Sequence, residues 1–345
     1  KMQCPRLNHF VRLQPNGKFG KCGHMVNAKT FDDIESMQQS NWLKGIHSQM
    51  DKNVWPAECV RCKMTEETTK TSIRLDMIER DRVLRAVQKD YLIVGGVLDN
   101  ICNSACQSCN AELSTKIGSL VSKDYKKINN YDRFFQLPQD RIVEVDVNGG
   151  EPTASPNYKK LLKNLPVSVK IIRINTNGSR VIPEVVALLE SGVRVIITLS
   201  FDGTGLVHDY ARWPIKWSDY KKNVFRYLEL RSQYKNLRLN FWTTVSCLNV
   251  GDLDNIVQYA SDNNIDHAYG FCITPIELDV RHSNKLTMDA KEKLSMSENT
   301  LLQSIGTTCA SLKNNSAELK QFVQSQDTLR KISFTDYFNF NLNLL

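Results

Sequence analysis

Apolar and polar positions alternate in blocks along the chain from residue 91 onwards. Short apolar runs rich in β-branched residues occupy residues 91–98, 142–147, 169–174, 193–199, 237–245 and 268–273. Longer segments with helical spacing of their apolar residues separate these runs, among them residues 158–165, 183–191, 220–234 and 252–263. Six strands that alternate with helices predict a parallel α/β sheet or barrel, in which ligands bind at the carboxyl ends of the strands.

The two ends of the chain have other patterns. Short runs at residues 10–13 and 18–21 flank Pro15-Asn16-Gly17, which predicts a hairpin. Apolar spacing predicts one helix over residues 31–50 and another over residues 72–89. Residues 276–345 lack a strand pattern before the aromatic stretch at 334–340, and we expect two or three helices there. We therefore expect an N-terminal domain (1–70), a linker helix (71–90), a core (91–275) and a helical extension (276–345).

Composition excludes several classes of protein. With 41% hydrophobic and 24% charged residues, the chain is not of the disordered type. Its longest apolar runs are strand-sized, and its first ten residues lack the apolar core of a signal peptide. The formal charge of +8 is mild and scattered, so it does not by itself indicate nucleic-acid binding. We expect a cytoplasmic protein without a membrane or nucleic-acid partner.

Cysteine is the informative residue. Ten cysteines in 345 residues are too few for a disulfide scaffold, and their spacing indicates metal chemistry in a reducing compartment. Cys102, Cys106 and Cys109 follow the first predicted strand with the spacing C-x3-C-x2-C. Three thiolates can hold three corners of a cubane iron–sulfur cluster and leave one iron open. A zinc site normally has four protein ligands, and no fourth is near in sequence.

Turn-forming motifs follow the next strands. Asn148-Gly149-Gly150-Glu151-Pro152 comes after the second strand, where two glycines let the backbone approach a ligand closely. Asn175-Thr176-Asn177-Gly178 follows the third strand, and Ser200-Phe201-Asp202-Gly203 follows the fourth. Such sequences also form ordinary turns, so position after a strand is what favours a binding role.

Together, the three-cysteine loop and the GGEP motif resemble the radical S-adenosylmethionine (SAM) superfamily over residues 91–275. The resemblance implies a partial (β/α)6 barrel and a 4Fe–4S cluster on Cys102, Cys106 and Cys109. It implies that the reduced cluster cleaves SAM to a 5′-deoxyadenosyl radical that abstracts hydrogen from a substrate, with flavodoxin or ferredoxin as electron donor. The residues that it implies for SAM binding are Gly149, Gly150, Glu151, Pro152, Asn175, Asn177, Ser200, Asp202 and Ile273.

Four further cysteines lie near the N-terminus. Four thiolates at Cys4, Cys22, Cys59 and Cys62 can close a cubane completely or bind a tetrahedral zinc ion. The spacing G-x4-C followed by C-x2-C resembles the SPASM/twitch auxiliary-cluster domains, which commonly follow the barrel but here precede it. This resemblance implies a twitch-like domain with a second 4Fe–4S cluster as electron acceptor, and zinc stays open as the alternative.

Several other side chains are open to more than one interpretation. Cys247 and Cys272 end the last two predicted strands, where a thiol can donate hydrogen or simply be buried. His208 and Asp209 follow the fourth strand and are candidate general bases or surface residues. Asp146 alternates with apolar neighbours, and its role is open.

The predicted function is radical modification of a peptide or protein substrate. One alternative is a radical dehydrogenase or isomerase acting on a small molecule such as an aminocyclitol or nucleotide. An alternative of another class is a non-catalytic zinc or iron–sulfur binding module. Reductive cleavage of SAM separates the two enzymes from the binding module.

Overall fold

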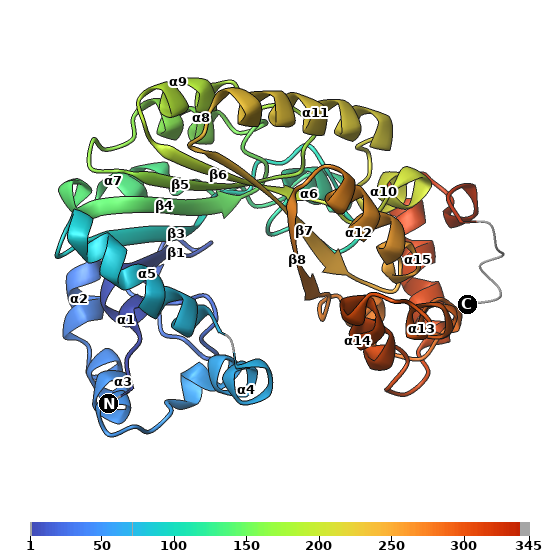
Figure 1. Cartoon of the computed structure of the whole chain (residues 1–345), viewed down its shortest axis with the longest axis horizontal. Coiled ribbons are helices and arrows are strands. Elements are labelled where there is room, and N and C mark those ends of the chain that lie inside the picture. Colours follow the sequence, from blue (N-terminus) through green and yellow to red (C-terminus); the bar gives the residue numbers. More distant parts are fainter. Residues whose placement is uncertain (1, 71, 339–345) are drawn as a thin grey trace. The chain divides into compact units, whose positions relative to one another are not determined.

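The structure is a computed structural model that describes residues 2–70 and 72–338. Its sheet confirms the predicted α/β class. Among these residues the strands form one eight-stranded sheet in the order β2-β1-β3-β4-β5-β6-β7-β8 (Figure 1). The pairs β1–β3, β3–β4, β4–β5 and β7–β8 are parallel. The six predicted strands are β3 (Leu92–Asp99), β4 (Ile142–Gly149), β5 (Ile171–Thr176), β6 (Arg194–Ser200), β7 (Leu237–Val245) and β8 (Asp266–Phe271).

The chain divides into two compact units. The first contains the residues up to Asn100 together with Lys127–Ile174 and Glu184–Val195. The second contains Ile101–Lys126, Asn175–Pro183 and the residues from Ile196 onwards. The three-cysteine loop therefore belongs to the second unit, whereas the GGEP turn and the four N-terminal cysteines belong to the first.

The N-terminal cysteine-rich segment of the first unit is joined to the sheet. Helix α1 (Pro5–His9) leads into β1 (Phe10–Leu13), which forms the predicted hairpin with β2 (Phe19–Gly20). Strand β1 also pairs in parallel with β3, and Phe10 lies opposite Ile93. Phe10 and Ile93 pack with Met77, Leu84 and Tyr91 in one buried cluster. The hairpin is therefore anchored by both hydrogen bonds and apolar packing.

The single helix predicted over residues 31–50 is wrong, because two helices form there. Helix α2 (Ile34–Gln39) ends before Ser40, and α3 (Asn41–Asp51) begins after it. The backbone of Ser40 is extended, and its hydroxyl accepts a hydrogen bond from the amide of Leu43. Asp33 caps α2 in the same way through the amide of Ser36. Two N-caps seven residues apart divide the apolar stripe.

The remaining elements of the first unit lie around this core. Helix α5 (Ile73–Val87) confirms the helix predicted at 72–89, and Ser72 caps it through the amide of Leu75. Glu144 on β4 is buried and accepts from Arg80 on α5 and Arg173 on β5. The other elements are η1 (Ala57–Cys59), α4 (Val60–Thr69), α7 (Tyr131–Phe135), η2 (Gln139–Arg141), α8 (Pro156–Lys163) and α9 (Glu184–Glu190).

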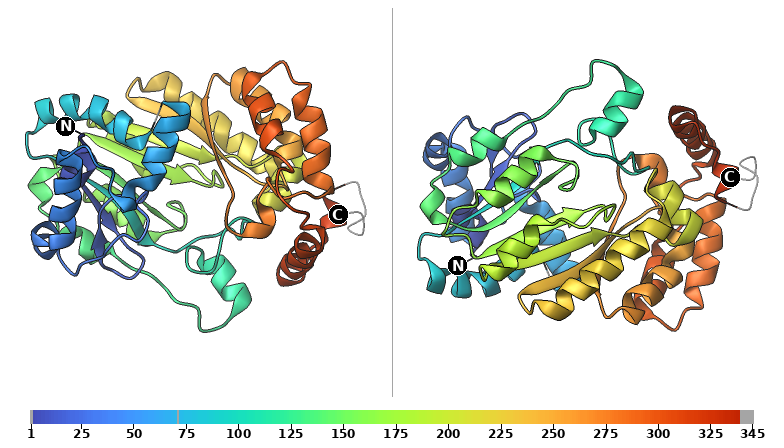
Figure 2. Two further views of the ribbon diagram at one scale, coloured as in Figure 1. Left: turned by 90° about the horizontal axis from the view of Figure 1, so that it is seen from below. Right: turned by 90° about the horizontal axis from the view of Figure 1, so that it is seen from above.

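The second unit carries the C-terminal helices. Buried and exposed residues alternate along β7, and its buried Phe241 packs in an aromatic cluster with Phe201, Trp217 and Tyr259. Figure 2 shows the C-terminal helices from two directions. The elements are α6 (Thr115–Val121), α10 (Gly205–Ala211), α11 (Trp217–Gln233), η3 (Val250–Asp252), α12 (Leu253–Asp262), η4 (Ile276–Leu278), α13 (Lys285–Ser295), α14 (Thr300–Thr308), α15 (Ser316–Arg330) and η5 (Phe334–Asp336).

The helical extension predicted from residue 276 is present in the described part of the chain. Its aromatic stretch begins as the turn η5, and residues 339 and 340 of that stretch lie outside the described residues. Within the described ranges, no helix has both the length and the apolar character needed to cross a bilayer.

Candidate functional site

The three-cysteine loop of the second unit brings its thiols close together. The hydroxyl of Ser104 lies 3.3 Å from the sulfur of Cys102 and 3.5 Å from that of Cys106. The amide of Cys109 donates to the carbonyl of Cys106 at 3.2 Å, which closes a tight turn. Burial raises the pKa of Cys109 to about 12, and the neighbouring Cys106 and Cys102 add to the effect. Three thiols on one loop are the donor set for three corners of a cubane, although among the described residues they do not converge on a single metal-ion position.

Hydrogen bonds from helix α6 fix the path of this loop. The hydroxyl of Ser114 caps α6 through the amide of Ile117 and also donates to the carbonyl of Ser104 at 2.7 Å. The hydroxyl of Thr115 accepts from the amide of Cys102 at 3.0 Å. Both side chains are at the start of a helix, where hydroxyls commonly satisfy backbone groups. The loop is thus held by neighbouring backbone before any ligand binds.

The end of β5 lies against the cysteine loop. The side-chain amide of Asn177, one of the residues implied for SAM binding, donates to Asn103 at 2.8 Å and to Ser104 at 3.2 Å. Asn103 in turn donates to Ser179 at 3.0 Å. The structure therefore brings Asn177 together with the predicted cluster loop, and its amide group orients that loop.

The end of β6 contributes a buried ion pair. Asp202 accepts from the amide of Thr244 at 2.7 Å and from Arg212 at 2.9 Å. Burial opposes the charge of Arg212, but Cys106 and Asp202 hold its pKa above the ordinary value. The buried Nε of Arg212 has no partner among the described residues. A sulfur or carboxylate of a bound group beside Cys106 would satisfy it, so the residues present fit an anionic cluster with its ligand. Sequence reasoning missed Arg212, because no local signal separates it from surface arginines.

The GGEP turn of the first unit is rigid. Gly149 has a φ of +129°, and a Cβ there would lie 1.9 Å from the carbonyl oxygen of Asp99, so only glycine fits. The amide of Gly150 donates to the same carbonyl at 2.9 Å. Buried Glu151 accepts from the amide and hydroxyl of Thr153 at 3.0 and 2.8 Å. The motif is therefore a preformed turn held by the end of β3, with Pro152 buried after it.

Carboxylates gather beside this turn. Asp99 accepts from Ser155 at 2.5 Å and from Asn157 at 3.1 Å. The hydroxyl of Tyr158 is buried and has no hydrogen-bond partner among the described residues. Burial raises the pKa of Tyr158, and the charges of Asp146, Glu151 and Asp99 raise it further.

The candidate hydrogen donors and bases are deeply buried. Cys247 and Cys272 belong to one apolar cluster with Leu248, Leu278, Leu319, Val323 and Phe334. Burial raises the pKa of Cys272 to about 11 and that of Cys247 further. Burial lowers the pKa of His208 to about 3, so its ring is neutral among Trp217 and Tyr220.

Three further candidates lie near strand ends. Asp209 accepts from the amide of Trp217 at 2.6 Å and pairs with Lys216 at 3.1 Å. Ser200 is the last residue of β6 and is partly buried, whereas the side chain of Ile273 is exposed. Asn175 lies near the end of β5 and is exposed.

Four elements of the first unit place the N-terminal cysteines around one cavity. Cys4 precedes α1, Cys22 follows β2, Cys59 precedes α4 and Cys62 is in the first turn of α4. All four line the same cavity with apolar neighbours that include Trp55. Burial raises the pKa of Cys4 to about 11 and that of Cys59 to about 12, and the other thiols add to both shifts. The structure thus brings together all four cysteines that the sequence predicts for the auxiliary site.

Backbone contacts explain this convergence. The amide of Val26, after Cys22, donates to the carbonyl of Glu58 at 2.9 Å and so ties the hairpin segment to the start of α4. Arg74 on α5 is bonded to Glu66 on α4 at 2.5 and 2.8 Å.

In residues 2–70 and 72–338, no three histidine, cysteine, aspartate or glutamate side chains converge closely enough to hold a single metal ion. The four thiols surround a cavity instead of meeting at one point. Four thiols are the donor set of a closed cubane or of a zinc site, and zinc would require them to move closer together than they lie here.

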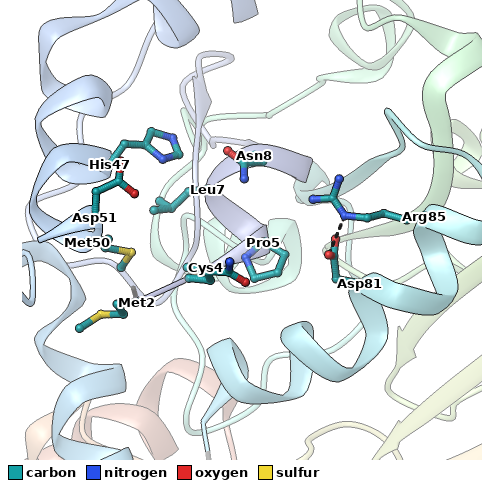
Figure 3. A pocket seen from close by; sticks show the side chains of 11 residues that line it. Met2, Cys4, Pro5, Leu7, Asn8, His47, Met50, Asp51, Asp81 and Arg85 are labelled. Carbon is teal, nitrogen blue, oxygen red and sulfur yellow. Dashed lines mark hydrogen bonds and ion pairs between the residues drawn. The ribbon is translucent and has the colours of Figure 1, made fainter. Parts of the chain in front are cut away.

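A second cavity of about 230 Å³ adjoins the four-thiol cavity. Cys4, Leu7 and Met50 line both cavities. Figure 3 shows His47 and Asp51 on one side of it and the ion pair of Asp81 with Arg85 on the other. The auxiliary site is therefore next to a cavity with polar walls.

Comparison with known proteins gives partial matches. No protein-family profile matches the chain. It is 30% identical over 113 residues to the mycofactocin maturase MftC of Mycobacterium ulcerans, which is 32% of this chain and 29% of the maturase. It is 22% identical over 207 residues to the GTP 3′,8-cyclase of Pasteurella multocida, with 56% of this chain and 57% of the cyclase covered.

Solved structures resemble the chain at low identity. The Streptococcus suis protein SuiB, in its crystal structure bound to the precursor peptide SuiA, matches with 12% identity and a TM-score of 0.42. The match covers 94% of this chain and 70% of SuiB. The matched segment spans less than a third of the length of the maturases and somewhat over half of the length of the cyclase.

Proposed function

We propose that the chain is a radical SAM enzyme that modifies a peptide or protein substrate by hydrogen abstraction. The observation that carries the proposal is the loop of Cys102, Cys106 and Cys109, on which the first two sulfurs flank Ser104, together with the buried, incompletely bonded Arg212. A 4Fe–4S cluster held by these three thiols would supply the electron for reductive cleavage of SAM.

In each unit, the chain's own residues hold groups in place before a ligand binds. Asn177 and Ser104 orient the cysteine loop, and Asp202 holds the guanidinium of Arg212 beside Cys106. In the other unit, the GGEP turn offers backbone groups that Asp99 fixes in place. Groups held before binding lose little conformational entropy when the ligand arrives, which favours binding and orientation.

We assign the four-thiol cavity to a second iron–sulfur cluster. Four cysteines close all corners of a cubane, so this cluster has no open iron for SAM and is suited to electron transfer. Burial raises the pKa of Cys62 and Cys22 adds to the rise, whereas Arg74 opposes it. Zinc is the alternative occupant, and it would make the site structural. The matching electron donor is a flavodoxin or ferredoxin, in a reducing cytoplasm.

One observation favours a peptide as substrate. It is the 113-residue similarity to mycofactocin maturase, a peptide-modifying relative.

A small-molecule substrate is the second candidate. The longer match to GTP 3′,8-cyclase, over 207 residues, supports it.

The test is 5′-deoxyadenosine formation by anaerobically reconstituted protein with dithionite and SAM. We expect formation by the wild type and none by the Cys102→Ala/Cys106→Ala/Cys109→Ala variant. Formation by this variant at the wild-type rate would refute the cluster assignment. Stimulation by a peptide library, and not by GTP, supports the peptide proposal, whereas stimulation by GTP alone would replace it with the second candidate.

A further inference from the structure

A buried arginine from the C-terminal extension reaches the cysteine loop. Arg330 is the last residue of α15 and is 3% exposed. Its Nε donates to the carbonyl of Ala105 at 2.8 Å, and its Nη2 donates to the carbonyl of Cys106 at 3.3 Å. Its Nη1 donates to the carbonyl and side chain of Gln326 at 3.2 and 2.6 Å. The guanidinium therefore bridges α15 and two consecutive residues of the loop.

Helix α15 is itself fixed one turn before Arg330. Asp327 accepts from the hydroxyl of Tyr210 at 2.8 Å and from the amide of Phe334 at 2.6 Å. Tyr210, Phe334, Leu319 and Val323 are fully buried in one cluster. Figure 1 shows α15 next to α10, the helix that carries Tyr210. Arg330 thus projects from a rigid element, which makes its position reproducible.

Backbone hydrogen bonds also hold this loop. The amide of Ala105 donates to the carbonyl of Trp213 at 2.7 Å, and the amide of Gln107 donates to that of Ala211 at 3.0 Å. The segment around Cys106 therefore lies between the carbonyls of Ala211 and Trp213 and the guanidinium of Arg330, and it has little freedom to move. Arg330 is the charged member of this arrangement.

The guanidinium of Arg330 is a charged group in direct contact with the loop, through the carbonyls of Ala105 and Cys106. A buried positive charge is costly unless an anion compensates it. Reduction adds one negative charge to an iron–sulfur cluster, and nearby charge and hydrogen bonds set its potential. At low local dielectric, that charge stabilises the reduced form more than a surface lysine can.

We propose that Arg330 is the positioning residue of the three-cysteine loop, and that its charge raises the reduction potential of the cluster held by Cys102, Cys106 and Cys109. The proposal rests on the cluster assignment made above. It gives the C-terminal extension a part in electron uptake by the SAM-binding cluster.

The test is a redox titration, followed by electron paramagnetic resonance, of the reconstituted full-length enzyme and its Arg330→Gln variant. The SAM-binding cluster is identified as the signal that changes when SAM is added. We expect Arg330→Gln to lower the equilibrium constant for reduction at least tenfold, which is 59 mV for a one-electron couple. Arg330→Lys, which keeps the charge, should restore most of this loss. Both comparisons measure a potential, which is independent of turnover.

Arg231 provides the matched control. It lies on α11 and also donates to two consecutive backbone carbonyls, those of Asn264 at 2.7 Å and Asn263 at 3.1 Å. Arg231→Gln should leave the potential unchanged. Two results would overturn the proposal. One is an equal shift of the potential in both glutamine variants, and the other is an equilibrium constant for reduction in Arg330→Gln that lies within threefold of the wild-type value.

A second variant covers poor folding of Arg330→Gln. Gln326→Ala removes the side-chain acceptor of Nη1, keeps the backbone acceptor at residue 326 and keeps the charge of Arg330, so we expect an altered signal shape with a smaller change in potential. An unchanged signal in Gln326→Ala would contradict the positioning role. A wild-type protein without any SAM-responsive cluster would instead refute the proposed function, so the two failures are distinguishable.

Discussion

Replacement of Asp146 by asparagine should stabilise the protein in a pH-dependent way. Asp146 lies partly buried on β4, and burial, with a contribution from Glu144, raises its pKa to about 6 from 3.8. Arg173, Arg6 and a hydrogen bond from Asn148 oppose this shift without cancelling it. The carboxyl is therefore ionised at pH 8 in a place that disfavours its charge. Asparagine has the same shape and no charge to bury.

The magnitude follows from the shift. A rise of about two units at about 1.36 kcal/mol each corresponds to a cost of about 3 kcal/mol once the group is ionised in both states. Between pH 3.8 and 6 the folded protein binds the proton more tightly than the unfolded chain. The contribution of protonated Asp146 to the free energy of unfolding is therefore fully present below pH 3.8. It falls as the pH rises to 6 and stays low above that pH. At pH 5 about half of the free-energy cost of ionising Asp146 in the folded protein is present.

The assay is anaerobic thermal unfolding of the holoenzyme at pH 5 and pH 8. With about 2.1 cal/mol/K per residue, 345 residues give an unfolding entropy of about 0.7 kcal/mol/K. We expect Asp146→Asn to raise Tm by about 4 °C at pH 8 and by about half as much at pH 5. Asp140→Asn, at an exposed carboxylate of the same unit, should change Tm little at either pH. A gain that is absent at pH 8, or equal at both pH values, would refute the reasoning.

Three further substitutions test the structure through thermal unfolding of the holoenzyme. Gly149→Ala should cost at least about 3 kcal/mol, because its Cβ overlaps a backbone carbonyl, whereas Gly192→Ala, with a φ of +85° and open space, should cost about 1 kcal/mol; equal losses would contradict this. Glu144→Gln should cost about 2–3 kcal/mol, since it leaves two arginines without their shared carboxylate, and an unchanged Tm would count against that ion-pair cluster. Tyr210→Phe should cost about 1 kcal/mol by removing the hydrogen bond to Asp327, and a neutral result would show that this bond contributes nothing.

The hydrophobic pattern was sufficient for the sheet because each strand is a compact apolar run bounded by polar turns. Strand β7 matches its predicted range of residues 237–245, and the motifs that follow β4 and β5 lie where a parallel fold places ligand contacts. The break at Ser40 could also have been predicted, because serine before a helical stripe is a capping signal. The apolar spacing on both sides concealed it.

Long-range contacts were beyond the sequence. Arg330 is 225 positions from Ala105, and one arginine among 45 basic residues carries no local mark of such a contact. Cys247 and Cys272 illustrate the related difficulty that a position at a strand end does not determine what surrounds a side chain. Their burial in an apolar cluster follows from the packing of α15 and η5, which the pattern of the strands does not contain.

The convergence of the four N-terminal cysteines was predictable as chemistry but not as geometry. Thiols in a G-x4-C and C-x2-C pattern indicate a shared metal site. The sequence does not show that β1 joins the sheet beside β3, which anchors the hairpin that carries Cys22. That pairing explains how a cysteine-rich segment ahead of the barrel strands is held in a fixed position.

Iron and sulfide analysis, combined with Mössbauer and paramagnetic resonance spectra, tests the central claim most directly. The samples are the anaerobically reconstituted wild type, the Cys59→Ala/Cys62→Ala variant and the Cys102→Ala/Cys106→Ala/Cys109→Ala variant. We predict about eight irons per chain in the wild type and about four in each variant, with a SAM-induced spectral change only where Cys102, Cys106 and Cys109 are intact. A SAM-responsive cluster that survives without these three cysteines would contradict the account.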